Sequence, residues 1–153
     1  MRNQLATHLG NRAVRFVDRV TQRLYRLTDG RIGHRQLGWT FLLLTTTGRK
    51  TGRPRVHALL YLPAGDDLVI VASNNGGDAH PAWYLNLCAQ PRVFVQAGRR
   101  KGAYRARTAS PDERRDLWPR LVAYNPPYRH HQEQTQREIP VVILSPVTDE
   151  TPT

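Results

Sequence analysis

The stretch that most constrains the fold reads LLLTTTGRKTGRPR and covers residues 42–55. Its apolar, β-branched first half predicts a strand, and the chain after it predicts a second strand. A glycine at each end of the connection encloses Arg49, Lys50 and Thr51, so the turn combines backbone N–H groups with positive charge. Such a turn can form an anion-binding nest. We therefore expect a hairpin that binds a phosphorylated ligand, although the turn alone also fits a solvated surface loop.

The spacing in this turn excludes two common phosphate sites. In a Walker-type loop, Gly-Lys-Ser/Thr follows a first glycine after four residues and leads into a helix, whereas Lys50 and Thr51 stand between two glycines. A Rossmann motif fails as well, because no Gly-x-Gly-x-x-Gly opens a helix in a βαβ unit. The turn belongs to neither class of nucleotide site.

Length and composition favour one folded domain. The chain has 153 residues, of which 39% are hydrophobic, which is enough for one core. Cys88 is the single cysteine, so no intramolecular disulfide can form, and its leucine neighbours predict a buried helix position. The sequence has no apolar run of about 18 residues and no secretory signal. These features favour a cytoplasmic location.

The charge predicts a polyanionic partner. The formal net charge is +11, and arginine carries almost all of the positive charge because Lys50 and Lys101 are the only lysines. Arginine binds phosphate and carboxylate oxygens with two parallel N–H groups. Nucleic acid, an anionic membrane surface and a highly charged cofactor all satisfy this condition.

Residues 1–38 are expected to form a basic amphipathic helix and a connector. Apolar residues recur at helical spacing between residues 4 and 27, ending with Leu24 and Leu27, and arginines run beside them. Three interpretations stay open. The helix can pack on the domain with its arginines in water, lie on anionic lipid at the inner face of the membrane, or bind nucleic acid.

Residues 39–147 are expected to form the main domain, and residues 148–153 a disordered tail. Strands rich in β-branched residues are predicted at 40–46, 56–62, 68–72, 93–97, 103–108 and 140–144, with a second basic turn at 99–102. Helices are predicted after Pro81, after a capping box at residues 110–113, and in a short piece at 128–137. About six strands with two to three helices beyond the first predict a small, mainly antiparallel barrel.

Several kinds of reactive site are missing from the sequence. The six histidines and the acidic residues show no metal-ligand spacing, so no metal site is expected. The histidines nearest the expected ligand loops, His57, His80 and His131, are interpreted as polar lining or surface groups. No Gly-x-Ser-x-Gly motif is present, and nothing near Cys88 would activate it. If the protein is an enzyme, a bound cofactor supplies its reactivity.

Five separated blocks together resemble a known family: LLTTTGRKTGRPRV (43–56), VIVASNNGG (69–77), HPAWYLNL (80–87), LWPRLV (117–122) and REIPVVIL (137–144). They resemble the deazaflavin-dependent nitroreductase family of actinobacteria, which includes F420-dependent quinone and nitro reductases. The resemblance covers residues 42–146. It implies a split β-barrel of the flavin-reductase kind that binds coenzyme F420, a phosphorylated deazaflavin with an acidic oligoglutamate tail.

The resemblance also implies roles for individual residues. The cofactor-binding positions carried over are Arg49, Lys50, Thr51 and Arg55 at the phosphate, Ala72, Ser73, Asn74, Asn75 and Gly76 along the ring, and Pro81 and Trp83 at its border. Tyr128 and Ser73 are candidate catalytic residues, as proton donors on the substrate side. Asn74 replaces a lysine of the best-known nitroreductase pattern, and tyrosines of that pattern are replaced by Leu60, Asn125 and His131.

These residues imply an enzyme in which reduced F420 passes a hydride to a small-molecule acceptor. The acceptor is expected to be a quinone, a nitroaromatic or an activated enone, with bulky nitroimidazoles disfavoured by the three replaced tyrosines. The protein is expected to be a monomer or a weak dimer. One alternative is the same barrel with FMN as its cofactor. A nucleic-acid-binding barrel is less favoured, because the basic turns contain no aromatic side chains for base stacking.

Overall fold

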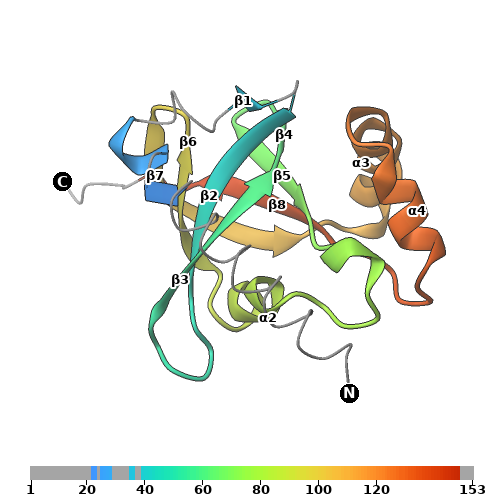
Figure 1. The fold of residues 1–153 in the computed structure, drawn as a ribbon, viewed down its shortest axis with the longest axis horizontal. Coiled ribbons are helices and arrows are strands. Elements are labelled where there is room, and N and C mark those ends of the chain that lie inside the picture. Colours follow the sequence, from blue (N-terminus) through green and yellow to red (C-terminus); the bar gives the residue numbers. More distant parts are fainter. Residues whose placement is uncertain (1–21, 24, 29–34, 37–38, 149–153) are drawn as a thin grey trace, which may run out of the picture.

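The computed structural model describes residues 22–23, 25–28, 35–36 and 39–148, and shows a curled antiparallel sheet with helices around it (Figure 1). The described strands are β1 (Arg35–Gln36), β2 (Trp39–Thr47), β3 (Pro54–Leu60), β4 (Leu62–Ala64), β5 (Asp67–Val71), β6 (Arg92–Ala97), β7 (Arg100–Thr108) and β8 (Val141–Pro146). The labelled helices are the 3-10 turn η1 (Asn74–Gly76), α2 (Ala82–Ala89), α3 (Pro111–Tyr124) and α4 (Pro127–Glu133).

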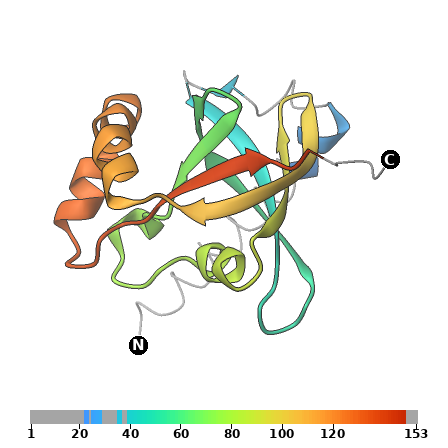
Figure 2. The same cartoon turned by 180° about the vertical axis from the view of Figure 1, so that it is seen from behind.

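The strands form one sheet that closes partly on itself. Its order is β1-β2-β6-β7-β8-β5-β4, and β3 also pairs with β2. The β2–β3 pairing extends from Phe41↔Leu60 to Thr47↔Pro54. Seen from both sides, α3 and α4 lie together at one end of the sheet, and α2 lies below it (Figures 1 and 2). The expected mainly antiparallel barrel with helices is therefore confirmed.

Strands β5 and β8 are apolar on both faces because both faces are buried. Side chains alternate along a strand, so Leu68 and Ile70 enter the barrel core while Val69 and Val71 face the α3–α4 side. On α3, Leu121 belongs to this second cluster and is 1% exposed. The two cores explain why these segments read as continuous apolar runs.

Three local expectations were wrong. The strand expected at 56–62 is divided at Tyr61, because the chain leaves β2 after Leu60 and pairs with β5 from Leu62 onward. The second basic turn lies earlier than residues 99–102, since Gly98 has a φ of 63° and Ala97 pairs directly with Arg100. Cys88 is exposed on α2 instead of buried.

Most of the expected N-terminal helix lies outside the described residues. Residues 22, 23 and 25–27 are helical. Tyr25 is buried, accepts a hydrogen bond from the Gly98 N–H at 2.8 Å, and its hydroxyl lies 3.0 Å from the Phe41 carbonyl oxygen. Leu27, expected in the apolar stripe, is 82% exposed. The end of this helix therefore packs on the sheet through a tyrosine.

The capping box predicted for α3 is confirmed. The Glu113 N–H donates to Ser110 Oγ at 3.3 Å, and the Ser110 N–H donates to Glu113 Oε1 at 3.0 Å. Arg107 donates to both Glu113 carboxylate oxygens at 2.6 and 2.8 Å. This pairing, together with the cap, lowers the pKa of Glu113 to about 2.

Removal of the Ser110 cap should make the protein less stable. We expect Ser110→Ala to lower the free energy of unfolding by about 1 kcal/mol, because an N–H group of the first turn loses its acceptor. Urea unfolding followed by circular dichroism measures the change. Ser110→Asp is the matched control, since aspartate caps as well as serine. Equal stability of the alanine variant and the parent protein would contradict this account of the helix start.

Candidate functional site

A cavity of about 610 Å³ opens between β3, the loop after β5, α2 and α4. Residues 57–60 of β3 form one wall. The other walls carry polar, aromatic and proline side chains, namely Ser73, Asn74, Asn75, Pro81, Trp83, Asn125, Tyr128 and His131. Ligand sites in proteins have volumes of about 300–1,000 Å³, and the cavity falls within that range.

The structure brings one group of the sequence-predicted residues together on this cavity. Ser73, Asn74, Asn75, Pro81, Trp83 and Tyr128 all line it, and so do the three positions where tyrosines of the family pattern are replaced, Leu60, Asn125 and His131. Ala72 and Gly76 belong to the same loop but lie behind the wall. Ala72 is fully buried, and Gly76 faces α4.

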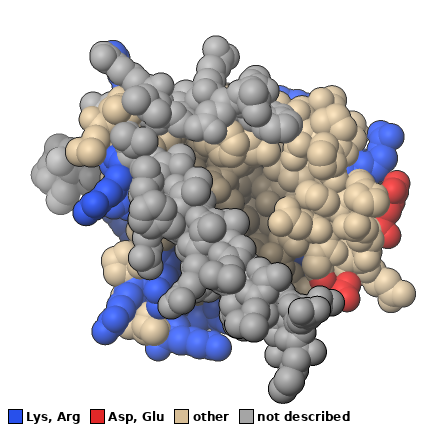
Figure 3. All heavy atoms as spheres, in the orientation of Figure 1, with Lys and Arg blue, Asp and Glu red and all other residues tan. Residues whose placement is uncertain are grey.

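The second group lies at the β2–β3 turn, outside the cavity wall. Arg49, Lys50, Thr51 and Arg55 are exposed. Basic side chains gather at the lower left of Figure 3, where Figure 1 shows this turn, while the acidic side chains in view lie on the opposite side. Figure 3 also shows the molecule hollowed near its centre, between the turn and the α3–α4 side.

Hydrogen bonds inside the turn leave two N–H groups for an anion. The Gly48 N–H donates to the Arg53 carbonyl at 2.8 Å, and the Gly52 N–H donates to the Gly48 carbonyl at 2.7 Å. The Arg53 N–H donates to Thr51 Oγ1 at 3.2 Å. Within the described part of the chain, the N–H groups of Lys50 and Thr51 have no acceptor. The tip of the turn is therefore the part of the loop where the expected nest could form.

Helix α2 joins the turn to the cavity through Asn86. This side chain is 4% exposed, and its Oδ1 accepts hydrogen bonds from the Arg49 N–H at 3.1 Å and from Arg49 Nη1 at 3.3 Å. Its Nδ2 donates to Thr46 Oγ1 at 3.2 Å. Trp83, one helical turn earlier, lines the cavity. The same helix therefore fixes the cationic turn and carries the aromatic wall.

Strand β3 makes a second connection between the two groups. Arg55 and His57 are two residues apart, so their side chains lie on the same face of β3. His57 lines the cavity, whereas Arg55 lies beside the turn, with its Nε 3.6 Å from the position of a Cβ built on Gly48. A ligand with an anionic end and a flat ring can therefore extend along β3.

The loop after β5 has an unusual backbone. Asn74 and Asn75 have φ angles of 48° and 53°, and Gly76 follows with 78°. These left-handed angles are unfavourable for residues with a Cβ, although asparagine tolerates them better than most. A Cβ on Gly76 would contact Gln134 Oε1 and would lie 2.9 Å from the His131 carbonyl oxygen. Only glycine fits where this loop meets α4.

Sequence reasoning missed two residues that hold the site. Asn86 lies within the predicted helix after Pro81, and Arg137 lies just before the last predicted strand, but no role or partner was predicted for either residue. Arg137 Nη2 donates to the Ser73 carbonyl at 2.7 Å and Arg137 Nε to the Gly77 carbonyl at 2.8 Å. Both residues stood in the resemblance blocks, but their partners are distant in sequence. Their position within these blocks was the one signal in the sequence that could have identified them.

Burial disfavours the charged forms of Tyr128, His131 and His80. Burial raises the pKa of Tyr128 to about 12, so its hydroxyl keeps its proton. Burial, and next the neighbouring His130, lowers the pKa of His131. Burial, and next Arg137, lowers the pKa of His80. The ring nitrogen His131 Nδ1 is buried without a hydrogen-bond partner among the described residues, which fits a neutral imidazole.

No group of three or more His, Cys, Asp or Glu residues in the described part of the chain could hold a metal ion. None of the helices described here combines the length and the hydropathy needed to cross a membrane.

Two glycines with similar backbone angles should respond differently to alanine. Gly52 has a φ of 68° with no atom within 4 Å of an added Cβ, whereas the added Cβ at Gly76 has close neighbours. We expect Gly52→Ala to cost about 1–2 kcal/mol of stability from the backbone alone. Gly76→Ala should cost roughly 1–3 kcal/mol more because of overpacking. Chemical unfolding of both variants tests the difference, and equal losses would show that α4 does not confine the loop.

Acidification should weaken the loop through His80. The pKa of this histidine lies below its ordinary value of 6.5, so the unfolded chain binds the proton first as the pH falls. The stabilisation is complete above about pH 6.5 and is lost as the pH decreases through the folded pKa. His80→Asn keeps a neutral acceptor for Arg137, so its melting temperature should fall less between pH 7 and pH 5. Identical pH profiles for the variant and the parent would contradict this role.

Comparisons with known proteins place the chain in a family. The sequence profile of the F420H(2)-dependent quinone reductase family matches residues 17–146. A protein of Mycobacterium tuberculosis (strain H37Rv) named F420H(2)-dependent quinone reductase is 39% identical over 145 residues, covering 92% of this chain and 95% of that protein.

Solved structures confirm the split β-barrel. One described as a domain-swapped dimer has a TM-score of 0.67 and 32% identity, and covers 93% of this chain and 100% of the other. Another, named F420-H2 dependent reductase (FDR-A), has a TM-score of 0.64 and 38% identity, and covers 69% of this chain and 93% of the other. The expected reductase class and its coenzyme F420 are confirmed at the level of the family. With its profile match and its 39% identical relative, this chain belongs to the F420H(2)-dependent quinone reductase family.

Proposed function

We propose that this protein reduces a quinone with electrons from reduced F420, holding the coenzyme's phosphate on the β2–β3 turn and its ring in the cavity. One observation carries this assignment: α2 and β3 each extend from the cationic turn to the cavity wall. When bound, reduced F420 supplies a hydride to the acceptor. The residues present fit the coenzyme, because the turn offers two N–H groups and several cations and the cavity offers an aromatic wall.

The turn is assigned to the anionic end of F420. Lys50 and Thr51 would contact the phosphate with backbone N–H groups, and Lys50 adds a charge-assisted hydrogen bond. Arg49 and Arg55 would bind the phosphate and the first carboxylates of the tail. A phosphodiester followed by several carboxylates accounts for this density of exposed cations better than a single phosphate does.

The loop and α2 are assigned to the flat ring. Ala72 and Gly76 shape the loop from behind, while Ser73, Asn74 and Asn75 present small polar groups along the ring. Pro81 and Trp83 would border the ring from the start of α2. The left-handed angles of the two asparagines turn the backbone of the loop away from an extended path, which would let the ring approach the loop closely.

Tyr128 and Ser73 are assigned to the acceptor. Tyr128 is 6% exposed and Ser73 is 9% exposed, so hydrogen bonds from their hydroxyls would act with little competition from water. Tyr128 keeps a proton at Oη because burial raises its pKa to about 12. Hydroxyl donors aimed at an acceptor oxygen stabilise the negative charge that develops there during reduction.

The acceptor preference follows from the walls of the cavity. Leu60, Asn125 and His131 line it at the positions where the nitroreductase pattern has tyrosines. We therefore propose quinones as the main acceptors, nitroaromatics and activated enones as poorer ones, and bulky nitroimidazoles as the poorest. Steady-state oxidation of reduced F420 with a panel of these compounds tests the order. Activity with nitroimidazoles but with no quinone would refute it.

Three wider expectations remain proposals. They are the division into residues 1–38, 39–147 and 148–153, contact of the N-terminal helix with anionic lipid at the inner membrane face, and a cytoplasmic monomer or weak dimer. Vesicle sedimentation with and without residues 1–38 tests lipid contact. Light scattering tests the oligomeric state, for which one solved relative is described as a domain-swapped dimer.

Lys50 provides the sharpest mutational test of the phosphate site. We expect Lys50→Ala to weaken F420 binding by about 10- to 100-fold, which corresponds to the loss of about 1.5–3 kcal/mol from one charge-assisted contact. Titration followed by tryptophan fluorescence measures the dissociation constant, with FMN as the competing cofactor.

The matched control is Arg99→Ala, which removes one exposed positive charge from the β6–β7 turn. This variant should bind F420 like the parent protein. Equal weakening in both variants would assign the effect to net charge alone. Quenching by FMN but not by F420 would overturn the proposed coenzyme.

A further inference from the structure

The loop after β5 needs support from outside itself. Three successive residues, Asn74, Asn75 and Gly76, have positive φ angles. The loop makes two short backbone hydrogen bonds of its own, from the Gly76 N–H to the Ser73 carbonyl at 2.9 Å and from the Gly77 N–H to the Asn74 carbonyl at 3.0 Å. Left-handed angles outside glycine persist only where the surrounding structure imposes them.

The guanidinium of Arg137 supplies that support at both ends of the loop. It donates from Nη1 to the Ala72 carbonyl at 3.2 Å, from Nη2 to the Ser73 carbonyl at 2.7 Å and from Nε to the Gly77 carbonyl at 2.8 Å. Nη1 also lies 3.1 Å from His80 Nδ1, which accepts in its neutral form. One planar group therefore joins the residues before and after the left-handed turn.

This set of contacts requires arginine in particular. Each of the four acceptors is a neutral oxygen or nitrogen, and none is a carboxylate. The rigid fork of a guanidinium can reach carbonyls in several directions at once, whereas a lysine ammonium is a single point. Loss of the fork would leave the Ala72 and Gly77 carbonyls without a donor among the described residues, and the Ser73 carbonyl with the Gly76 N–H alone.

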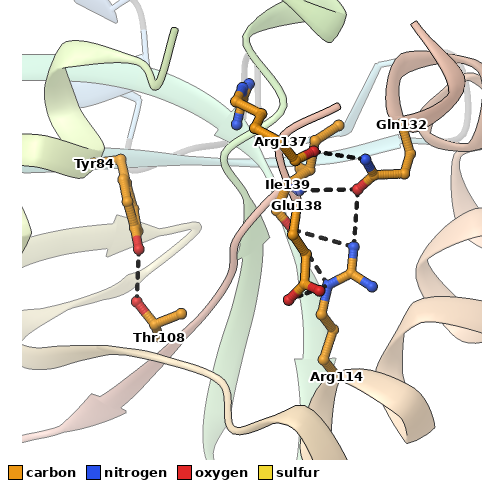
Figure 4. Close-up of polar contacts among 7 residues, drawn as sticks. All are labelled: Tyr84, Thr108, Arg114, Gln132, Arg137, Glu138 and Ile139. Atoms are coloured by element: carbon orange, nitrogen blue, oxygen red, sulfur yellow. Dashed lines mark hydrogen bonds and ion pairs between the residues drawn. The ribbon is translucent and has the colours of Figure 1, made fainter. Parts of the chain in front are cut away.

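The backbone of Arg137 is itself held by the helices. Gln132 on α4 donates from Nε2 to the Arg137 carbonyl at 2.8 Å, and its Oε1 accepts from the Ile139 N–H at 2.9 Å (Figure 4). Arg114 on α3 donates to the same Gln132 oxygen at 3.0 Å and to the Ile139 carbonyl at 3.3 Å (Figure 4). Arg114 and Gln132 thus bind the main chain of residues 137–139, whereas the contacts with the loop itself come from the Arg137 guanidinium.

We propose that Arg137 is a positioning residue, whose guanidinium holds residues 72–77 in the shape that binds the F420 ring. This inference rests on the proposed function for the identity of the ligand. The holding of the loop is independent of the ligand, because every contact that carries it lies within the protein. Arg137 does not line the cavity itself, so it acts through Ser73 and its neighbours.

The test compares Arg137, which contacts the loop, with Arg114, which contacts Gln132 and Ile139 instead. Arg137→Lys keeps the positive charge but loses the guanidinium whose N–H groups donate to the loop carbonyls. Arg114→Lys loses bonds to Gln132 and Ile139 but has no contact with the loop among the described residues. Amide hydrogen exchange of the protein without coenzyme is measured over residues 72–80. We expect exchange there to rise by about 10-fold or more in Arg137→Lys and to stay near the parent level in Arg114→Lys.

Coenzyme binding supplies a second readout. The dissociation constant for F420 should rise about 10-fold or more in Arg137→Lys. It should rise less in Arg114→Lys, even where the melting temperatures of the two variants fall by the same amount. Guanidinium ion at millimolar concentration should restore part of the affinity to Arg137→Ala and leave the parent protein unchanged.

Two results would overturn the proposal. Unchanged exchange over residues 72–80 in folded Arg137→Lys would show that the guanidinium does not hold the loop. A uniform rise across the whole chain in both variants would assign Arg137 to general stability. If the parent protein fails to bind F420, the proposed function fails, and the exchange data still decide whether Arg137 holds the loop.

Discussion

The pairing of β2 with β3 is the constraint on which the site depends. This ladder places the Gly48–Gly52 turn at one end and the cavity wall at the other, so the distance between them is set by the strand geometry. Asn86 adds a cross-link from α2, because its buried amide forms hydrogen bonds with both Thr46 and Arg49 of the turn. A change in the register of this pair would therefore separate the cations from the aromatic wall.

The two ends of the site use different physics. The turn is exposed and cationic, so its attraction for an anion acts over several ångströms and weakens with salt. The cavity is lined by buried groups such as Tyr128 and Ser73, where neutral hydrogen bonds are strong and orientation is fixed. Binding strength would come mainly from the first end, and the placement of the reacting atoms from the second.

Local signals in the sequence predicted much of this architecture. The β2–β3 hairpin, the capping box at Ser110 and most of the β-branched strands depend on neighbours within a few residues, and they appear as expected. Two of the five resemblance blocks, 69–77 and 80–87, also contain residues that line the cavity, among them Ser73, Asn74 and Trp83. By contrast, Asn86 and Arg137 act on partners 37 to 65 residues away, so their roles depend on the folded topology. The exposure of Cys88 and the division of the strand at Tyr61 also depend on the folded topology.

The most direct test of the account compares F420 with the deazaflavin alcohol that lacks the phosphate and the glutamate tail. Calorimetric titration of both ligands at low and high salt measures what the cationic turn contributes. The account predicts that F420 binds at least about 10-fold more tightly at low salt, and that the difference shrinks as salt is added. Equal affinities at both salt concentrations would contradict the assignment of the turn to the anionic end of the coenzyme.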